Sequence, residues 1–416
     1  MSVHVLQSKR GASCVCALCA RTLDLNILIS RKVPMVRNVK ALTVSSYLSM
    51  FFLGFMSTLI GAAARNIGLT PFQIGLMLAF QNVGFVVSVS VSGALADMRE
   101  KPRLLFWGTL AVIMGLVVFY LTDTLTFYLL AMLLLGAGIG TYEGVTDAML
   151  IDLHTGRESL HISVNHFFVT FGSIAITAYM IFLQMNWRNA IIQAAAVVSV
   201  LAIFFALARL EVRNVHNNSY RERVVILGRE PIILILFACI MLAVGVETGF
   251  IGVLTTFLME LRGFDQVTSK IGLLVFLFGI VTGRLLVGFL TAQQRIPQVI
   301  LGLMGLAVIV YSILFTVDLG DFVYMLIYVA GFSLSALLPM MLSAAGLLYR
   351  EMSGTVLGLV KIAIPLGSIV LPLVMGLVAN HSSFQGSLLI FPAAFTIAFL
   401  LMLLIQPRMR LVARPS

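Results

Sequence analysis

Apolar runs of about 20 residues recur from Ala41 to Gln406, and they constrain the fold more than any other feature of this chain. Each run is long enough to cross a hydrocarbon layer of ~30 Å as an α-helix, which satisfies its own backbone hydrogen bonds there. Of the 416 residues, 60% are hydrophobic and only 11% are charged. A soluble domain has about a quarter of its residues charged, so the sequence predicts an all-α membrane protein.

Turn residues, charges and prolines divide the apolar sequence into twelve predicted transmembrane helices. They cover residues 41–63, 73–97, 104–122, 126–150, 162–184, 189–209, 231–258, 268–291, 297–317, 322–349, 354–379 and 385–406. The one long polar break separates two sets of six helices. We therefore expect a six-helix bundle over residues 39–210, a cytoplasmic linker over 211–230, a second bundle over 231–407 and a cytoplasmic tail over 408–416.

Basic residues in the predicted loops give the orientation. An even number of helices puts both termini on one side of the membrane, and Lys and Arg are enriched on the cytoplasmic side. The bases on the side of the termini are Arg31, Lys32, Arg37, Lys40, Arg99, Lys101, Arg103, Arg157, Arg213, Arg221, Arg223, Arg229, Arg295, Arg350, Arg408, Arg410 and Arg414. This pattern predicts cytoplasmic termini in the cell (inner) membrane. The formal charge of +10 is spread over these loops rather than one soluble face, so we expect no nucleic-acid partner.

Residues 1–38 precede the first predicted helix and are expected to be disordered or untranslated, with Met35 as an alternative start. Residues 11–30 are interrupted by charges, so we expect no clean cleavable signal peptide there. A closed zinc site needs four ligands, and only three cysteines cluster here, at Cys14, Cys16 and Cys19. We therefore expect no metal site in this segment.

The two halves echo one another after their second predicted helices. Residues 93–103 read Gly-Ala-Leu-Ala-Asp-Met-Arg-Glu-Lys-Pro-Arg, and residues 288–295 read Gly-Phe-Leu-Thr-Ala-Gln-Gln-Arg, without the acid. The first stretch resembles the cytoplasmic signature of the major facilitator superfamily, Gly-x-Leu-x-Asp-Arg-x-Gly-Arg-[Lys/Arg], although Met98 stands where that family usually has Arg. The resemblance implies two pseudo-symmetric bundles that rock about a site at their interface. It also implies gating contacts at Gly93, Asp97, Arg99 and Arg103.

A narrower resemblance points to the fucose and glucose permease branch of that superfamily, which contains sugar:proton symporters. Residues 136–147 are similar to the branch pattern Gly-x-Gly-x-Gly-x-x-Glu-x-x-x-Asn, with Asp147 in place of Asn. Residues 166–172 are similar to its His-x-Phe-Phe-Gly-x-Gly. The resemblance implies that Glu143 is a proton site. The branch's other carboxylate, in the first helix, has no counterpart here.

Ionisable side chains are costly inside a bilayer, so those in the predicted helices are expected to face a polar cavity or a partner. Glu143 and Asp147 are four residues apart on one helical face, and His166 should lie at the same depth in the next helix. We predict that these three residues take part in proton coupling, because a carboxyl placed in this way can take up and release a proton. A buried structural hydrogen bond remains the alternative for Glu143 and His166.

The second half has one acid, Glu247, and two bases, Arg284 and Lys361, within its predicted helices. One acid–base pair is expected, and the surplus positive charge could hold an anionic solute. A gate latch for Arg284 and a lysine reaching toward the cytoplasm are the alternatives. The predicted substrate-binding residues are these three together with Gln81, Asn82 and Tyr142.

The sequence therefore predicts a monomeric secondary transporter without cofactor that moves a small polar solute, sugar-like or a carboxylate, with protons. An efflux carrier for amphipathic or anionic compounds is the alternative. A membrane sensor or scaffold on the same fold is a third possibility, because fold alone does not fix function. Neither Gly-x-x-x-x-Gly-Lys-[Ser/Thr] nor His-Glu-x-x-His occurs, so neither an ATP-driven pump nor a zinc enzyme is expected.

Overall fold

The computed structural model describes residues 38–67, 71–182, 186–210, 220–318 and 320–412. Within these residues, twelve helical spans are long and apolar enough to cross a membrane. They correspond to the twelve predicted helices and confirm the all-α membrane class. The cysteine cluster of the N-terminal segment lies outside the described residues.

The first six spans are single helices that pack around one apolar core. They are α2 (Val39–Ile67), α3 (Pro71–Ala96), α4 (Lys101–Leu121), α5 (Leu125–Leu153), α6 (Glu158–Phe182) and α7 (Trp187–Leu207). Helix α5 lies between α3 and α4, and α2 packs on α6. We refer to these helices as the first bundle. A short helix, α8 (Tyr220–Gly228), follows within the predicted linker.

The second bundle packs around a second apolar core, to which Ala148, Ile151 and Ile162 of the first bundle also contribute. It comprises α9 (Pro231–Arg262), α10 (Gln266–Leu290), α11 (Ile296–Thr316), α12 (Val323–Ser335), α13 (Leu337–Leu348), α14 (Ser353–Val360), α15 (Ala363–His381), α16 (Phe384–Leu388) and α17 (Ile390–Val412). Three predicted helices are thus each divided in two.

Each division lies just before a proline. Pro339, Pro365 and Pro392 all occupy the third position of the helix that follows the break. Proline lacks an N–H and clashes with the carbonyl four residues earlier, so the preceding helix ends, whereas proline in a first turn breaks no intrahelical hydrogen bond. One consequence is that Lys361 lies at the break between α14 and α15.

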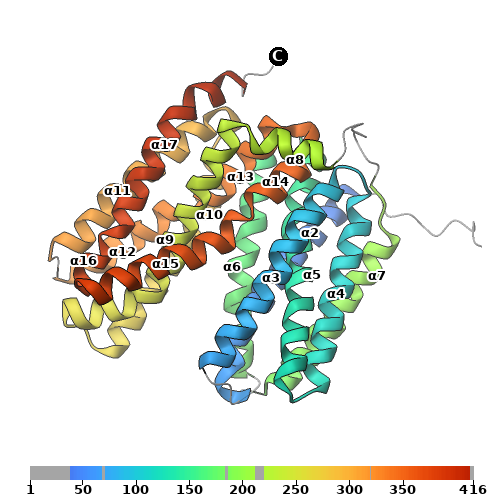
Figure 1. The fold of residues 1–416 in the computed structure, drawn as a ribbon, viewed down its shortest axis with the longest axis horizontal. Coiled ribbons are helices and arrows are strands. Elements are labelled where there is room, and N and C mark those ends of the chain that lie inside the picture. The colour runs from blue at the N-terminus through green and yellow to red at the C-terminus, as the bar shows by residue number, and fades with distance from the viewer. Residues whose placement is uncertain (1–37, 68–70, 183–185, 211–219, 319, 413–416) are drawn as a thin grey trace, which may run out of the picture.

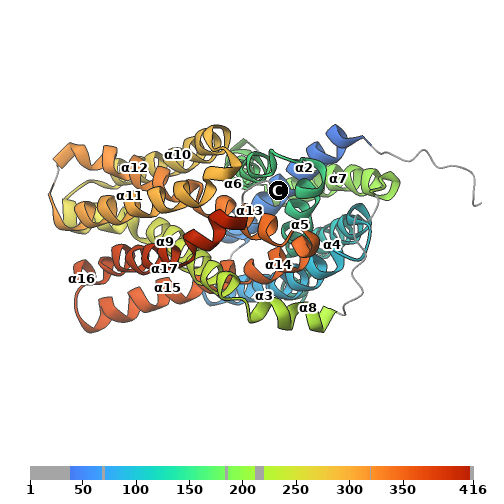
Figure 2. The same cartoon turned by 90° about the horizontal axis from the view of Figure 1, so that it is seen from above.

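The two bundles stand side by side and converge at one end, where α8, α13, α14 and the end of α17 lie (Figure 1, top). We call this the closed end and the opposite end the open end. The end-on view in Figure 2 shows α13 and α14 at the junction of the bundles. The bundles meet where α3 packs on α14, and where α6 packs on α10 and α13.

Candidate functional site

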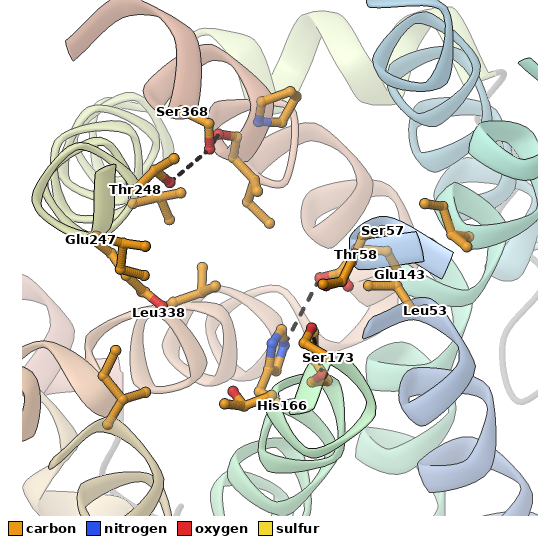
Figure 3. A pocket seen from close by; sticks show the side chains of 18 of the residues that line it. Leu53, Ser57, Thr58, Glu143, His166, Ser173, Glu247, Thr248, Leu338 and Ser368 are labelled. Atoms are coloured by element: carbon orange, nitrogen blue, oxygen red, sulfur yellow. Dashed lines mark hydrogen bonds and ion pairs between the residues drawn. The ribbon is translucent and has the colours of Figure 1, made fainter. Parts of the chain in front are cut away.

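A cavity of about 780 Å³ lies between the bundles and is lined by both. Figure 3 shows Glu143, His166 and Ser173 on one side of it, with Glu247, Thr248 and Ser368 across from them. Of the predicted site residues, the lining includes Gln81, Asn82, Glu143, His166, Glu247 and Arg284. Hydroxyl groups of Ser57, Thr58, Thr170, Ser173, Thr248 and Ser368 add hydrogen-bonding capacity, and apolar side chains cover most of the remaining wall.

Lys361 joins the two bundles beside this cavity. Its Nζ lies 2.6 Å from Asp147 Oδ2 and 3.0 Å from Glu143 Oε1, and it also donates to the carbonyl oxygen of Glu143. Lys361 and Asp147 are completely buried. The ammonium therefore neutralises carboxylates of the opposite bundle, and it does not reach toward the membrane surface as the sequence alternative supposed.

His166 and Asn165 complete this group of charges. His166 Nε2 lies 3.1 Å from Asp147 Oδ2 and 3.9 Å from Glu143 Oε1, so the expected histidine–carboxylate contact is present. Asn165 Nδ2 donates to Asp147 Oδ1 over 2.7 Å. The potential metal-ligating atoms of Glu143, Asp147 and His166 lie within 4.8 Å of one another. The ammonium of Lys361 lies against both carboxylates, so it supplies the positive charge here.

Arg284 pairs with Glu247 and reaches across to the first bundle. Its Nη2 lies 3.2 Å from Glu247 Oε1, which is the acid–base pair expected in the second half. Its Nη1 donates to the carbonyl oxygen of His166 over 3.0 Å and to the hydroxyl of Thr170. Its Nε donates over 3.1 Å to the carbonyl oxygen of Ser335. That oxygen has no helical N–H partner, because the residue four positions later is Pro339.

Among the described residues, the expected surplus of positive charge is absent from this site. Arg284 is paired with Glu247, and Lys361 is paired with two acids of the first bundle. The expectation was wrong because it counted the acids of the second half alone. Three carboxylates, those of Glu143, Asp147 and Glu247, thus face one guanidinium and one ammonium group at this site.

The remaining predicted binding residues differ in position. Tyr142 is completely buried, and its hydroxyl donates to Thr109 Oγ1 in α4 over 3.0 Å, so it is not brought to the cavity. Gln81 and Asn82 do line the cavity. Their amide nitrogens donate to the backbone carbonyls of Met56 and Leu78, respectively.

Asp97 ties the bundles together at the closed end. Its carboxylate accepts hydrogen bonds from the backbone N–H groups of Gly354 at 2.7 Å and Thr355 at 2.8 Å, at the N-terminus of α14, and from the Thr355 hydroxyl. Arg223 of α8 lies 2.9 Å from it and is completely buried. Arg223 is a contact that sequence reasoning missed, because nothing local distinguishes it from the other linker arginines.

Of the other predicted gating residues in this region, one lies at the contact between the bundles and two lie at the surface. Gly93 lies at the crossing of α3 and α14, where a Cβ would come within 2.7 Å of the Gly354 oxygen. Arg99 and Arg103 are exposed, and Arg103, in the first turn of α4, forms an ion pair with Glu100 at the N-cap of that helix. The structure thus brings Gly93 and Asp97 to the contact between the bundles and leaves the two arginines at the surface.

A stacked histidine pair lies near the closed end within the first bundle. The ring centroids of His154 and His161 are 3.5 Å apart. Thr43 Oγ1 lies 2.7 Å from His154 Nε2, and the Tyr47 hydroxyl lies 2.6 Å from His161 Nδ1. Burial lowers the pKa of His154, so this ring is neutral at neutral pH. These contacts join α2 to His154, which follows α5, and to His161 in the first turn of α6, and they lie outside the cavity lining.

Comparisons with known proteins agree with this architecture. A family model described as Major Facilitator Superfamily matches residues 42–363. A curated relative, the Protein TsgA homolog of Buchnera aphidicola subsp. Baizongia pistaciae (strain Bp), is 25% identical over 158 residues, which are 36% of this chain and 41% of the relative. The match therefore spans less than half of that relative's length.

Solved structures show the same fold at low identity. A crystal structure of the E. coli fucose:proton symporter FucP is 15% identical with a TM-score of 0.72 and covers 88% of this chain and 99% of its own. The human organic anion transporter MFSD10 (TETRAN) is 14% identical with a TM-score of 0.72, covering 88% and 100%. The proton:xylose symporter XylE is 13% identical with a TM-score of 0.68, covering 89% and 96%.

Proposed function

We propose that this chain, which belongs to the Major Facilitator Superfamily, is a secondary transporter that moves a small, neutral, sugar-like solute together with protons. The chain is a multi-pass membrane transporter rather than an enzyme. The solute class, the coupling ion and the orientation are the proposed parts. The solute would occupy the cavity between the bundles, and the bundles would rock to open it to each side in turn.

The cavity supports a solute that needs many hydrogen bonds and little charge. Two side-chain amides and six hydroxyl groups line it, and its volume of about 780 Å³ lies within the range of ordinary ligand pockets. The apolar part of the wall suits the carbon face of a ring. FucP and XylE, which share the fold, are described as symporters of fucose and xylose with protons.

Pairing of both cations supports a neutral solute over an anionic one. MFSD10 shares the fold and is described as an organic anion transporter, so an anionic solute is the alternative. Binding an anion would require a positively charged group without a carboxylate partner. In this chain Arg284 and Lys361 each contact carboxylates, and three donor nitrogens of Arg284 already have acceptors. An anion would have to displace one of these carboxylates, which is costly for buried charges.

Proton coupling is proposed at Glu143, and one observation carries it. Among the described residues, Glu143 both lines the cavity and contacts Lys361, the lysine that joins the two bundles. Protonation there would change the solute site and the contact between the bundles together. Asp147 and His166 would share the proton, because both lie in the same buried group.

We also propose that the closed end faces the cytoplasm in the inner membrane. The described parts of the predicted cytoplasmic loops, which have the excess of Lys and Arg, lie at this end. The cavity between the bundles would then face outward in this state.

Uptake into proteoliposomes tests the proposed function. Purified protein is screened with neutral sugars, polyols and sugar acids, with and without an inward proton gradient. We expect a neutral solute to accumulate with the gradient, and Glu143→Gln to retain solute exchange at equilibrium while losing accumulation. Gradient-independent uptake of every transported solute, unchanged in Glu143→Gln, would contradict coupling at this residue. Selective uptake of anions would contradict the solute class.

A further inference from the structure

We propose that Glu143, Asp147 and His166 form a binding site for one exchangeable monovalent cation, H⁺ or Na⁺, and that the ammonium group of Lys361 is a built-in competitor for it. This deepens the proposed function and rests on it in one respect, namely that the bundles separate at the closed end during the cycle. In the conformation described above, the Lys361 ammonium occupies the site.

The geometry around Lys361 is that of a filled cation site. Three potential ligand atoms from two helices lie within 4.8 Å of one another and are buried. Lys361 Nζ is 2.6 Å from one carboxylate and 3.0 Å from the other. Glu143 Oε1 is buried, and its charged neighbours are the Lys361 ammonium at 3.0 Å and His166 Nε2 at 3.9 Å. It is therefore a ligand atom for a cation that replaces the ammonium.

The ligands and their competitor belong to different bundles. Glu143, Asp147 and His166 are in α5 and α6, whereas Lys361 lies at the break that precedes Pro365 in the second bundle. When the bundles separate at the closed end, Lys361 must withdraw from the site. Two adjacent buried carboxylates without a counter-charge are unstable, so a cation has to enter.

Charge conservation favours a monovalent cation. Lys361 contributes one positive charge, and one H⁺ or Na⁺ restores the same total, whereas a divalent ion would exceed it. Carboxylate oxygens suit both candidates, and the His166 nitrogen suits a proton. Each transport cycle in which Lys361 withdraws would therefore move one cation together with the solute.

Neighbouring titratable groups already have partners of their own. Glu247 of α9 and Arg284 of α10 pair with each other, and Asp97 of α3 pairs with Arg223 of α8. Helix α13, which packs on α6 and α14, has no ionisable residue between Leu337 and Leu348. In α2 the Tyr47 hydroxyl lies 2.6 Å from His161 Nδ1. The charge of the site is therefore set by its own three residues and Lys361.

Thiol labelling at the closed end tests this inference without solute or membrane gradient. Ser159 is 3% exposed, and its hydroxyl lies 3.1 Å from Met340 Sδ of the other bundle. In a background without native cysteines, Ser159→Cys should react with a maleimide only when the closed end opens. We expect labelling to become about tenfold faster either as the pH falls at low sodium or as sodium replaces choline at neutral pH. The arm that responds identifies the cation.

Lys361→Met decides the role of the competitor. We expect fast labelling in this variant, insensitive to pH and sodium, because nothing then competes with the cation. Lys101→Met is the matched control, since Lys101 is a buried lysine paired with Asp152 within the first bundle. It should keep the cation response of the parent. If Lys361→Met does not fold, Lys361→Met with Asp147→Asn removes one charge of each sign and should behave in the same way.

The inference would be overturned if the Lys361 variants were labelled at the same rate as the parent. It would also be overturned if their labelling rate still responded to the cation. A parent that responds to neither cation would overturn it as well. A cation response in protein that transports no tested solute would leave the cation site standing and contradict the proposed function instead.

Discussion

The two bundles cross at two pseudo-equivalent places near the closed end, and the crossings are held differently. Where α3 meets α14, the acid comes from the other bundle: Asp97 caps the N-terminus of α14, which has no acid in its own first turn. Where α10 meets α6, the acid is already in the first turn of α6, as Glu158. The N-terminus of a helix favours a negative charge, and each crossing supplies one.

This difference explains why the repeat has an acid in its first copy only. The second copy, residues 288–295, packs near a helix whose own Glu158 is paired with Arg350 of the second bundle. A second acid there would face a like charge. The Asp97 contact is fully buried, whereas the Arg350 side chain is 36% exposed, so the first crossing should be the stronger lock.

Replacing Asp97 by Asn should have the largest effect, because it leaves Arg223 buried without its counter-ion. Removing one partner of a buried ion pair costs about 3–5 kcal/mol. We expect the closed end to open, seen as rapid maleimide labelling of Ser159→Cys in the same protein. Labelling as slow as in the parent would show that Asp97 does not lock the bundles.

Alanine at the two equivalent glycines should give a smaller effect that differs between the crossings. A Cβ on Gly93 would lie 2.7 Å from backbone atoms of Gly354 and Gly358, whereas a Cβ on Gly288 would meet the Ser163 side chain at 2.7 Å. Overpacking costs about 1–3 kcal/mol, and backbone yields less than a side chain. Gly93→Ala should therefore lower the unfolding temperature in detergent more than Gly288→Ala. A larger decrease in unfolding temperature for Gly288→Ala would contradict the claim that the crossing of α3 and α14 is the tighter one.

Replacing Glu158 by Gln should have the smallest effect. Arg350 is partly exposed and water can solvate it, so the loss should be about 1 kcal/mol or less. Added salt should screen the partly exposed Glu158–Arg350 ion pair. The maleimide labelling rate at the closed end of the parent should therefore rise toward that of the Glu158→Gln variant. An effect as large as that of Asp97→Asn would show that the two crossings are equally strong locks.

The sequence predicted the elements of this protein better than their contacts. The twelve spans follow from the apolar runs and from the turn residues, charges and prolines that divide them, and the depth of Glu143, Asp147 and His166 follows from helical spacing. The partner of Lys361 could not be predicted, because which faces of two separate bundles meet is set by tertiary packing. The same reason hid the role of Arg223, and helical spacing did not show that Tyr142 faces α4.

Spin-label distances across the two ends test the central claim most directly. One pair joins the exposed positions Met98 and Gln294 at the closed end, and another joins Thr124 and Ser382 at the open end. Adding the transported solute with its coupling cation should lengthen the first distance and shorten the second in the same population. Two distances that never change, or that change in the same direction, would contradict alternating access around this cavity.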